Sequence, residues 1–285
     1  CAWAQDSHPA WLNASLTGGV QWDGNLFGYR NETPAGQPDV TNRSSLVLSA
    51  QGQLACDFAK LFELGEAVKE FSLGYSGGGY WYVDAASEDY ASHAVPFVLK
   101  AGGEKWDLSV AQHFLFVDGS REAPVYDPAA VNAFGLVFPR ERRQQFQDRG
   151  QVRINYRAGD FFLRPAAQWR YTDMRTLMRP QTGYQNFVDR SDVNGGLDTG
   201  YFVDENFNLF AGYRYGYQYH QSIPWVGRNA TNHYHRALFG AQIGDKEWSL
   251  SVQAGPTFHE YTGKRLAGQG KHLTRLYAEI AAQFK

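Results

Sequence analysis

The chain has 285 residues, a formal net charge of −2, 15% aromatic residues and 30 glycines. The nearly neutral charge indicates no preference for nucleic acid or for any other strongly charged partner. The mean hydropathy of −0.48, without an apolar run of about eighteen residues, excludes an ordinary transmembrane helix. The low mean hydropathy and the lack of a long apolar run are both compatible with a membrane β-barrel, because apolar and polar residues alternate along its strands and the average is polar.

The chain begins with the sequence CAWAQDS, for which two interpretations remain. The Ala-Trp-Ala stretch resembles the end of a secretory signal that is cut after Ala4. A mature chain that starts with Cys1 resembles a bacterial lipoprotein acylated on that residue, and this is the preferred interpretation. Both imply export, and residues 1–11 are expected to form a periplasmic segment. Cys56 either pairs with Cys1 in a disulfide or stays a free thiol.

Strand-like segments follow one another from residue 12 to residue 285. Near the end of the chain, Leu276, Ala278 and Ile280 share one face, and polar side chains occupy the other. A period of two over many residues indicates a β-strand; only the short stretch 63–69 suggests a helical turn. Twelve strands are predicted, at about 12–30, 44–61, 69–83, 92–101, 105–117, 144–157, 160–174, 190–203, 207–220, 232–244, 247–261 and 272–285.

The connections between these segments alternate strictly between short and long. The short ones contain LGEAVK, AGGEK, RAGD, VDENF and IGDKE. The long ones are 31–43, 84–91, 118–143, 175–189, 221–231 and 262–271. This alternation is typical of periplasmic turns and extracellular loops. We therefore expect an all-β fold over residues 12–285, a transmembrane antiparallel up-and-down barrel of about twelve strands with both termini in the periplasm.

If the apolar series of side chains faces lipid, the alternating polar series faces the lumen. Guanidinium groups stay charged and present a fork of donors suited to carboxylate, sulfate or phosphate, so arginines along a pore favour the passage of anions. Alternatively, they pair with inward acids such as Asp192, Asp198 and Glu279 and brace a filled lumen. The predicted pore-lining arginines are Arg149, Arg153, Arg157, Arg164, Arg170, Arg214, Arg236 and Arg275.

Twelve long strands, short turns at one end and an arginine-lined wall resemble the group of oligogalacturonate and sialic-acid porins. The resemblance implies an anion-selective channel in a bacterial outer membrane. The long connection 118–143 resembles the loop that folds into the pore of general porins. It carries Arg140, Arg142 and Arg143, which are candidates for a constriction. An ordinary surface loop is the alternative interpretation of this segment.

One alternative function is enzymatic. The sequence His-Gln-Ser at the outer end of the ninth strand resembles the His-x-Ser pair of outer-membrane phospholipase A and lipid A deacylase. By that resemblance Ser222 is the nucleophile, His220 the base, and Asn232 or His235 the group that orients the imidazole. Those families have Asn after the serine, where this chain has Ile223. Since His220 also continues the polar register of its strand, a lipid hydrolase is not preferred.

The preferred function is passive diffusion of small anionic solutes across the outer membrane, in contact with membrane lipid. No catalytic residue, cofactor, metal ion or nucleic acid is expected. His233 and His235 lie on one face of a strand without an evident third ligand. The non-enzymatic alternative is a structural barrel in a larger envelope complex, which a lipid anchor on Cys1 would suit. A homo-oligomer is compatible with either function.

Overall fold

The computed structural model describes residues 11–24, 44–119, 121, 143–175, 188–222, 230–245, 247–263 and 270–284. These residues contain twelve β-strands of 12 to 15 residues each. The strands are β1 (Leu12–Asp23), β2 (Ser45–Asp57), β3 (Val68–Tyr82), β4 (Tyr90–Gly102), β5 (Trp106–Asp118), β6 (Gln145–Ala158), β7 (Phe161–Met174), β8 (Arg190–Phe202), β9 (Phe207–His220), β10 (Asn232–Gly244), β11 (Trp248–Tyr261) and β12 (His272–Phe284).

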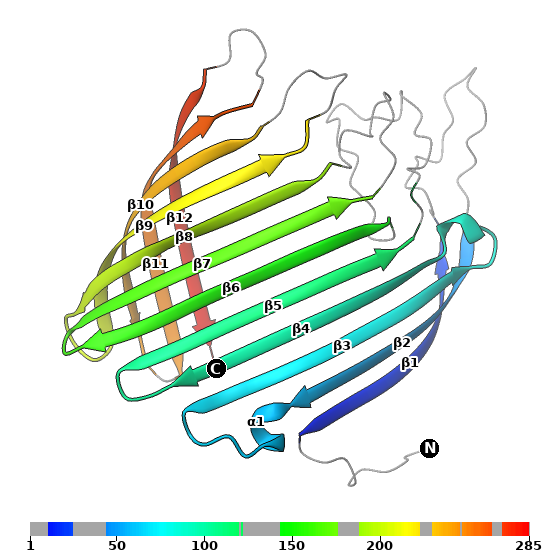
Figure 1. The fold of residues 1–285 in the computed structure, drawn as a ribbon, viewed down its shortest axis with the longest axis horizontal. Coiled ribbons are helices and arrows are strands. Elements are labelled where there is room, and N and C mark those ends of the chain that lie inside the picture. Colours follow the sequence, from blue (N-terminus) through cyan, green and yellow to red (C-terminus); the bar gives the residue numbers. More distant parts are fainter. Residues whose placement is uncertain are drawn as a thin grey trace.

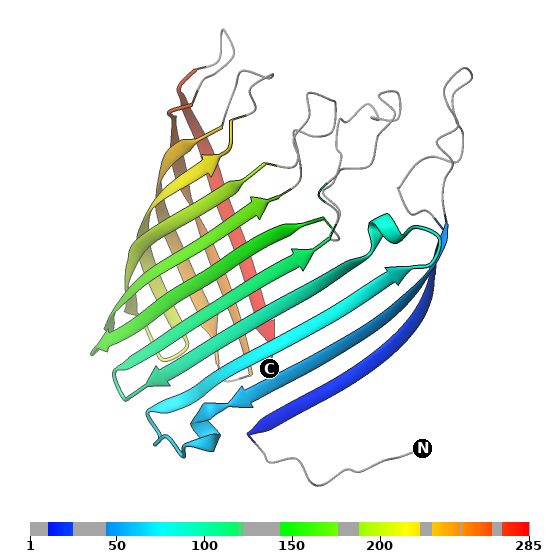
Figure 2. The same cartoon turned by 45° about the vertical axis from the view of Figure 1, so that its right-hand side comes forward.

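All twelve strands belong to one antiparallel sheet in which each strand pairs with its neighbours along the chain. The sheet curls so that β10–β12 lie behind β7–β9 (Figures 1 and 2). Strands β1 and β12 are its two edges within the described residues. The predicted all-β, up-and-down arrangement of twelve strands is therefore confirmed. None of the helices in the described part of the chain is long and apolar enough to span a membrane.

The strand ends that short connections join lie at the opposite end of the sheet from the strand ends that long connections join (Figure 1). We call the end with the connections 58–67, 103–105, 159–160, 203–206 and 245–247 the turn end, and the opposite end the loop end. The tightest connection is the turn at Gly159, whose φ of 65° favours glycine. Both Leu12 and Phe284 lie at the turn end, which is where the sequence places the strand termini.

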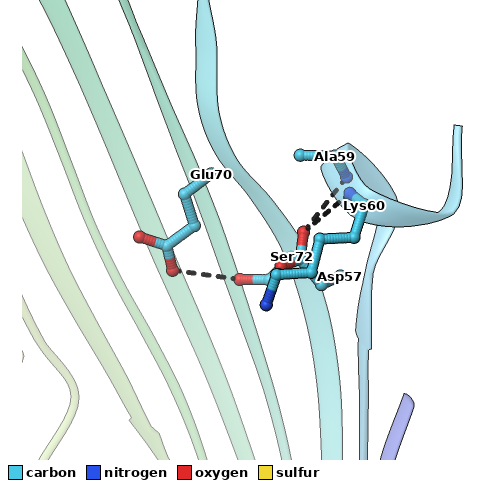
Figure 3. A network of polar contacts seen from close by, with 5 residues as sticks. All are labelled: Asp57, Ala59, Lys60, Glu70 and Ser72. Carbon is cyan, nitrogen blue, oxygen red and sulfur yellow. Dashed lines mark hydrogen bonds and ion pairs between the residues drawn. The ribbon is translucent and has the colours of Figure 1, made fainter. Parts of the chain in front are cut away.

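The second predicted strand, 44–61, is too long by one helical turn. Strand β2 ends at Asp57, and residues Phe58–Leu61 form the helix α1. The Asp57 carboxylate caps this helix by accepting hydrogen bonds from the backbone N–H groups of Ala59 (3.1 Å) and Lys60 (3.3 Å), as Figure 3 shows. The helical turn thus precedes the stretch 63–69 in which it was predicted. The first predicted strand also ends earlier, at Asp23, and its residues beyond Gly24 lie outside the described part.

The large apolar side chains on one face of the sheet are exposed. Examples are Leu16 (84% exposed), Phe239 (66%) and Leu276 (80%). A soluble domain does not expose apolar side chains in such continuous series, because covering them is the main favourable contribution to folding. This face, which we call the outer face, suits contact with lipid rather than with water.

A small apolar cluster packs on the opposite, inner face at the loop end. Its buried members are Val47, Tyr82 and Ala85. The rings of Tyr80 and Tyr90 stack beside them with centroids 4.4 Å apart. These contacts hold the connection between β3 and β4, which contains the short 3₁₀ helix Ala86–Glu88, against the strand ends.

Candidate functional site: an arginine-rich inner wall

All eight arginines predicted to line a pore lie on the inner face of the sheet. The strand register shows this directly, because the side chains of residues that are Cα partners in neighbouring strands point to the same face of the sheet. Arg149 is the partner of Arg170, and Arg214 is the partner of Arg236. The outer face carries the other series, for example Ile154 on β6, which is 38% exposed.

Four of these arginines lie in a single row that crosses the sheet. We call Arg153, Arg214, Arg236 and Arg275 the arginine row. Small side chains separate some of its members, so the guanidinium groups have room to extend over the inner face. The successive Cα partners along the row are Arg153, Ala166, Gly196, Arg214, Arg236, Thr257 and Arg275.

Two further arginines form a second level, nearer the loop end. Arg149 and Arg170 lie four residues along their strands from Arg153 and Ala166, which is about 13 Å at the usual rise of a strand. Between the two levels lies a row of amide side chains, which we call the amide row. Its members, Gln151, Gln168 and Asn194, are successive Cα partners.

The amide row is shared by two hollows on the inner face. The larger hollow has a volume of about 550 Å³ and includes Arg149 and Arg170 in its lining. The smaller hollow, of about 230 Å³, includes three members of the arginine row. Gln151, Gln168 and Asn194 line both of them. The two arginine levels therefore open into adjoining spaces with neutral hydrogen-bonding groups between them.

One member of the arginine row is held by a mostly buried ion pair. The guanidinium of Arg214 contacts the Asp198 carboxylate through two nitrogens, at 2.7 and 2.8 Å. Glycine at position 212 makes this possible, because a Cβ there would collide with the Asp198 carboxylate. The Arg214 and Asp198 side chains are 17% and 10% exposed, so this pair braces the wall.

The other two inner acids of β6–β12 hydrogen bond to neutral groups. Asp192 accepts hydrogen bonds from the amide of Gln218 at 2.7 Å and from the hydroxyl of Tyr234 at 3.3 Å. Glu279 accepts a hydrogen bond from the amide of Gln253 at 2.8 Å and another from the Tyr277 hydroxyl. These hydrogen bonds hold the two carboxylates in place through neutral donors, with no ion pair to an arginine.

Several arginines consequently keep their charge unpaired. Within the described residues, no carboxylate lies within 4.0 Å of the guanidinium groups of Arg149, Arg153 or Arg170. Arg149 donates to the amide oxygen of Gln147 at 2.6 Å instead. Like charges directly opposite each other in a sheet are destabilising. Asp192, the Cα partner of Arg170 on β8, lines the same hollow and offsets part of this charge. The juxtaposition of Arg149 and Arg170 still favours an anion from solution between them.

The difference between a buried and an exposed ion pair gives a first prediction. Asp198→Asn leaves Arg214 charged and mostly buried, so we expect the free energy of unfolding to fall by about 3 kcal/mol. Urea unfolding of the protein in lipid vesicles measures the change. Asp107→Asn is the matched control, because its partner Lys69, at 2.7 Å, and Asp107 itself are each more than half exposed; we expect a loss below about 1 kcal/mol. Equal losses in the two variants would contradict the bracing role.

The remaining predicted arginines lie toward the turn end of the inner face. The guanidinium of Arg157 lies 4.2 Å from the ring centroid of Phe202, and that of Arg164 lies 4.3 Å from that of Phe162. These contacts are cation–π interactions that hold the two side chains against the wall. Sequence reasoning did not include Arg190, although it has the same alternation as Asp192 and faces inward at the start of β8.

The candidate constriction is described only at one residue. Arg140 and Arg142 lie outside the described residues. Arg143 is fully buried, and its guanidinium contacts the Glu88 carboxylate at 3.1 and 3.3 Å. It therefore ties the end of the 118–143 connection to the 3₁₀ helix at the loop end. The Cys1 anchor and the segment 1–10 also lie outside the described residues.

The residues proposed for a lipid hydrolase do not contact one another as a catalytic group in the structure. Within the described residues, Ser222 makes no hydrogen bond with His220; the backbone N–H of His220 donates instead to the Thr231 hydroxyl at 3.2 Å. The Asn232 side chain contacts Gln218 and His259. His235 lies on the outer face, where it pairs with the Tyr213 hydroxyl at 2.6 Å. The proposed relay of Ser222, His220 and an orienting group is not assembled among these residues.

Comparison with known proteins yields distant structural likenesses. No family model matches the chain, and no curated protein matches its sequence. Among solved structures, it is similar to outer-membrane expressed OmpT of Vibrio cholerae, with a TM-score of 0.43, 10% identity, and coverage of 97% of this chain and 77% of that chain. It is also similar to the in-vitro folded trimer form of OmpT from the same organism, with a TM-score of 0.37, 9% identity and 95% coverage of both chains.

Proposed function

We propose that the chain closes into a β-barrel in the bacterial outer membrane and that small anionic solutes diffuse passively through its lumen. The observation that carries this proposal is the set of unpaired, directly opposed arginines on the face that encloses two hollows. A site of this kind offers several charge-assisted hydrogen bonds to an anion, and the amide row offers neutral ones between the two levels.

The outer face supports the membrane location. Its exposed apolar side chains would be costly in water but suit the hydrocarbon interior of a bilayer. A bilayer also provides no hydrogen bonds for an open sheet edge, where each unpaired backbone group costs several kcal/mol. In the membrane the edges β1 and β12 therefore pair with each other and enclose the lumen.

The structural, non-conducting alternative accounts for only part of the inner wall. A barrel that serves as a brace or anchor explains the pair of Arg214 and Asp198, because that pair fills space and joins neighbouring strands. It gives no reason for the unpaired charges of Arg149, Arg153 and Arg170. Anion diffusion accounts for both sets of arginines, so it is the function proposed here.

Single-channel recording in planar bilayers tests this proposal. We expect stepwise conductance, and in a potassium chloride gradient we expect a reversal potential whose sign indicates that chloride is more permeant than potassium. Absence of conductance from folded, inserted protein would contradict the channel and favour the structural barrel. Conductance with a preference for potassium would contradict the role of the arginines.

A further inference from the structure

The larger hollow on the inner face has two sides of different chemistry. It lies over the neighbouring strands β4–β8, so it does not depend on any contact between β1 and β12 (Figure 1). The side formed by β4 and β5 carries the apolar side chains of Pro96, Val98 and Ala111. The side formed by β6 and β7 carries Arg149 and Arg170, together with members of the amide row. A ligand in this hollow therefore meets an apolar surface on one side and a cationic surface on the other.

The strand register fixes how these two sides face the same ligand. Pro96, His113, Arg149 and Arg170 are successive Cα partners from β4 to β7. Neighbouring strands are about 4.8 Å apart, so the Cα atoms of Pro96 and Arg149 are separated by about 10 Å along this row. His113 is exposed between them. A carboxylate held by the arginines thus leaves the rest of a small molecule beside His113 and over Pro96.

The apolar side offers no hydrogen bonds to a ligand. Val98 and Ala111 are Cα partners, and the backbone of both strands is engaged in the sheet. Glycine at position 74 leaves room for the Pro96 ring, because a Cβ there would lie 3.0 Å from the Cγ of that ring. A ligand hydroxyl against this surface would lose its hydrogen bonds to water, whereas a hydrocarbon group gains by leaving water. This side therefore selects against polyhydroxylated acids.

The cationic side carries an excess of one positive charge. Arg149 and Arg170 contribute two positive charges and Asp192 one negative charge to the lining, with His113 counted as neutral. Asp192 is already held by the two neutral donors described above. Among the described residues, the guanidinium of Arg170 makes no ion pair and donates no hydrogen bond, so its fork of donors is available. One carboxylate matches both this charge and this geometry.

We propose that the larger hollow binds small aromatic monocarboxylates such as benzoate. The carboxylate pairs with Arg170 and Arg149, and the ring covers Pro96, Val98 and Ala111. A ring suits the space better than a flexible chain, because a rigid ligand loses less conformational freedom on binding and its face attracts a nearby guanidinium. The inference rests on the proposed passage of anions and names the class of anion that this site selects.

Calorimetric titration of the folded protein with benzoate and with gluconate tests the apolar side. The two acids carry the same charge, so we expect benzoate to bind at least about tenfold more tightly because of its ring. The variant Val98→Thr/Ala111→Ser places two hydroxyl groups on the apolar side with little change in size. We expect it to lower the ratio of benzoate to gluconate affinity at least about fivefold.

The matched control is Ala55→Ser/Ala281→Ser. It adds two hydroxyl groups to exposed positions of the inner face that line neither hollow, opposite Gly74 and Ser251. We expect this control to keep the affinity ratio of the parent. It also corrects for any benzoate that partitions into detergent or lipid, since that amount is the same for all variants.

The variant Arg170→Gln tests the cationic side. We expect weaker binding of both acids, because both present a carboxylate. The proposal is overturned if the parent does not prefer benzoate, if Val98→Thr/Ala111→Ser keeps the parent's affinity ratio, if the control lowers that ratio equally, or if Arg170→Gln binds benzoate as tightly as the parent.

Calorimetry detects binding without conduction, so the two proposals fail separately. A protein that binds benzoate as expected but shows no conductance would contradict only the channel. A protein that conducts chloride selectively but shows no preference for benzoate would contradict only the binding site in the larger hollow.

Discussion

Replacement of Arg149, Arg153 and Arg170 by glutamine will remove most of the preference for anions. None of the three has a carboxylate within 4.0 Å of its guanidinium among the described residues, although Asp192 is the Cα partner of Arg170, so their loss subtracts positive charge without breaking an ion pair. A unit charge about 4 Å away contributes roughly 1 kcal/mol in water, or about a fivefold change in the local concentration of an anion. We therefore expect the anion-to-cation permeability ratio to fall by about tenfold or more.

The reversal potential in a salt gradient measures this ratio. The matched control is Lys105→Gln/Lys271→Gln, which also removes positive charge, but from exposed positions in a short turn and a long connection. We expect the control to keep the reversal potential of the parent. An unchanged potential in the arginine variant, with the protein folded and inserted, would show that other groups set the selectivity.

Substitution by arginine on the outer face will destabilise the protein far more than substitution by arginine on the inner face. Val95 and Ala94 are neighbours near the middle of β4 and point to opposite sides: Val95 is the partner of the exposed Phe114, and Ala94 is the partner of Ser76. A guanidinium that faces lipid near the midplane costs about 2–4 kcal/mol. We expect this loss for Val95→Arg and a loss below about 1 kcal/mol for Ala94→Arg, which faces the lumen.

Urea unfolding in vesicles measures both variants, and the parent supplies the reference. Because the two positions are adjacent in the chain, each variant is the control for the other. Similar midpoints would contradict the assignment of the faces, and a larger loss for Ala94→Arg would reverse it. In detergent, which hydrates a charge on the outer face more readily than a bilayer does, the difference between the variants should shrink.

The alternation of side chains was enough to predict the strands and their faces, since both are local properties. Leu276 and Ile280 indicate the lipid face of β12 without any knowledge of the neighbouring strand. Helix α1 was missed because the apolar residues Phe58 and Leu61 continue the composition of β2, while the deciding contact is the cap by Asp57. The two hydrogen bonds that the Asp57 side chain accepts therefore outweigh the pattern at this boundary.

The rows across the sheet could not be predicted from the sequence, because they depend on the register between strands. Arg153 and Arg275 are 122 positions apart in the printed sequence, yet they share one row through six successive pairings. A short motif can also mislead: His220 and Ser222 are close in sequence and suggested a catalytic pair, but among the described residues the two side chains are not hydrogen-bonded to each other and have no orienting group.

The neighbour-to-neighbour order of the sheet has a consequence for how the protein assembles. Every pairing among the described strands joins consecutive segments, so each hairpin can form with a small loss of chain entropy. In the described residues β1 and β12 are the open edges of the sheet, and the closing contact proposed between them would join the two ends of the chain, at an entropic cost of about 5 kcal/mol. This contact should form last and limit the folding rate. Until then both edges are free to pair with another chain, so swapped dimers are expected at high protein concentration.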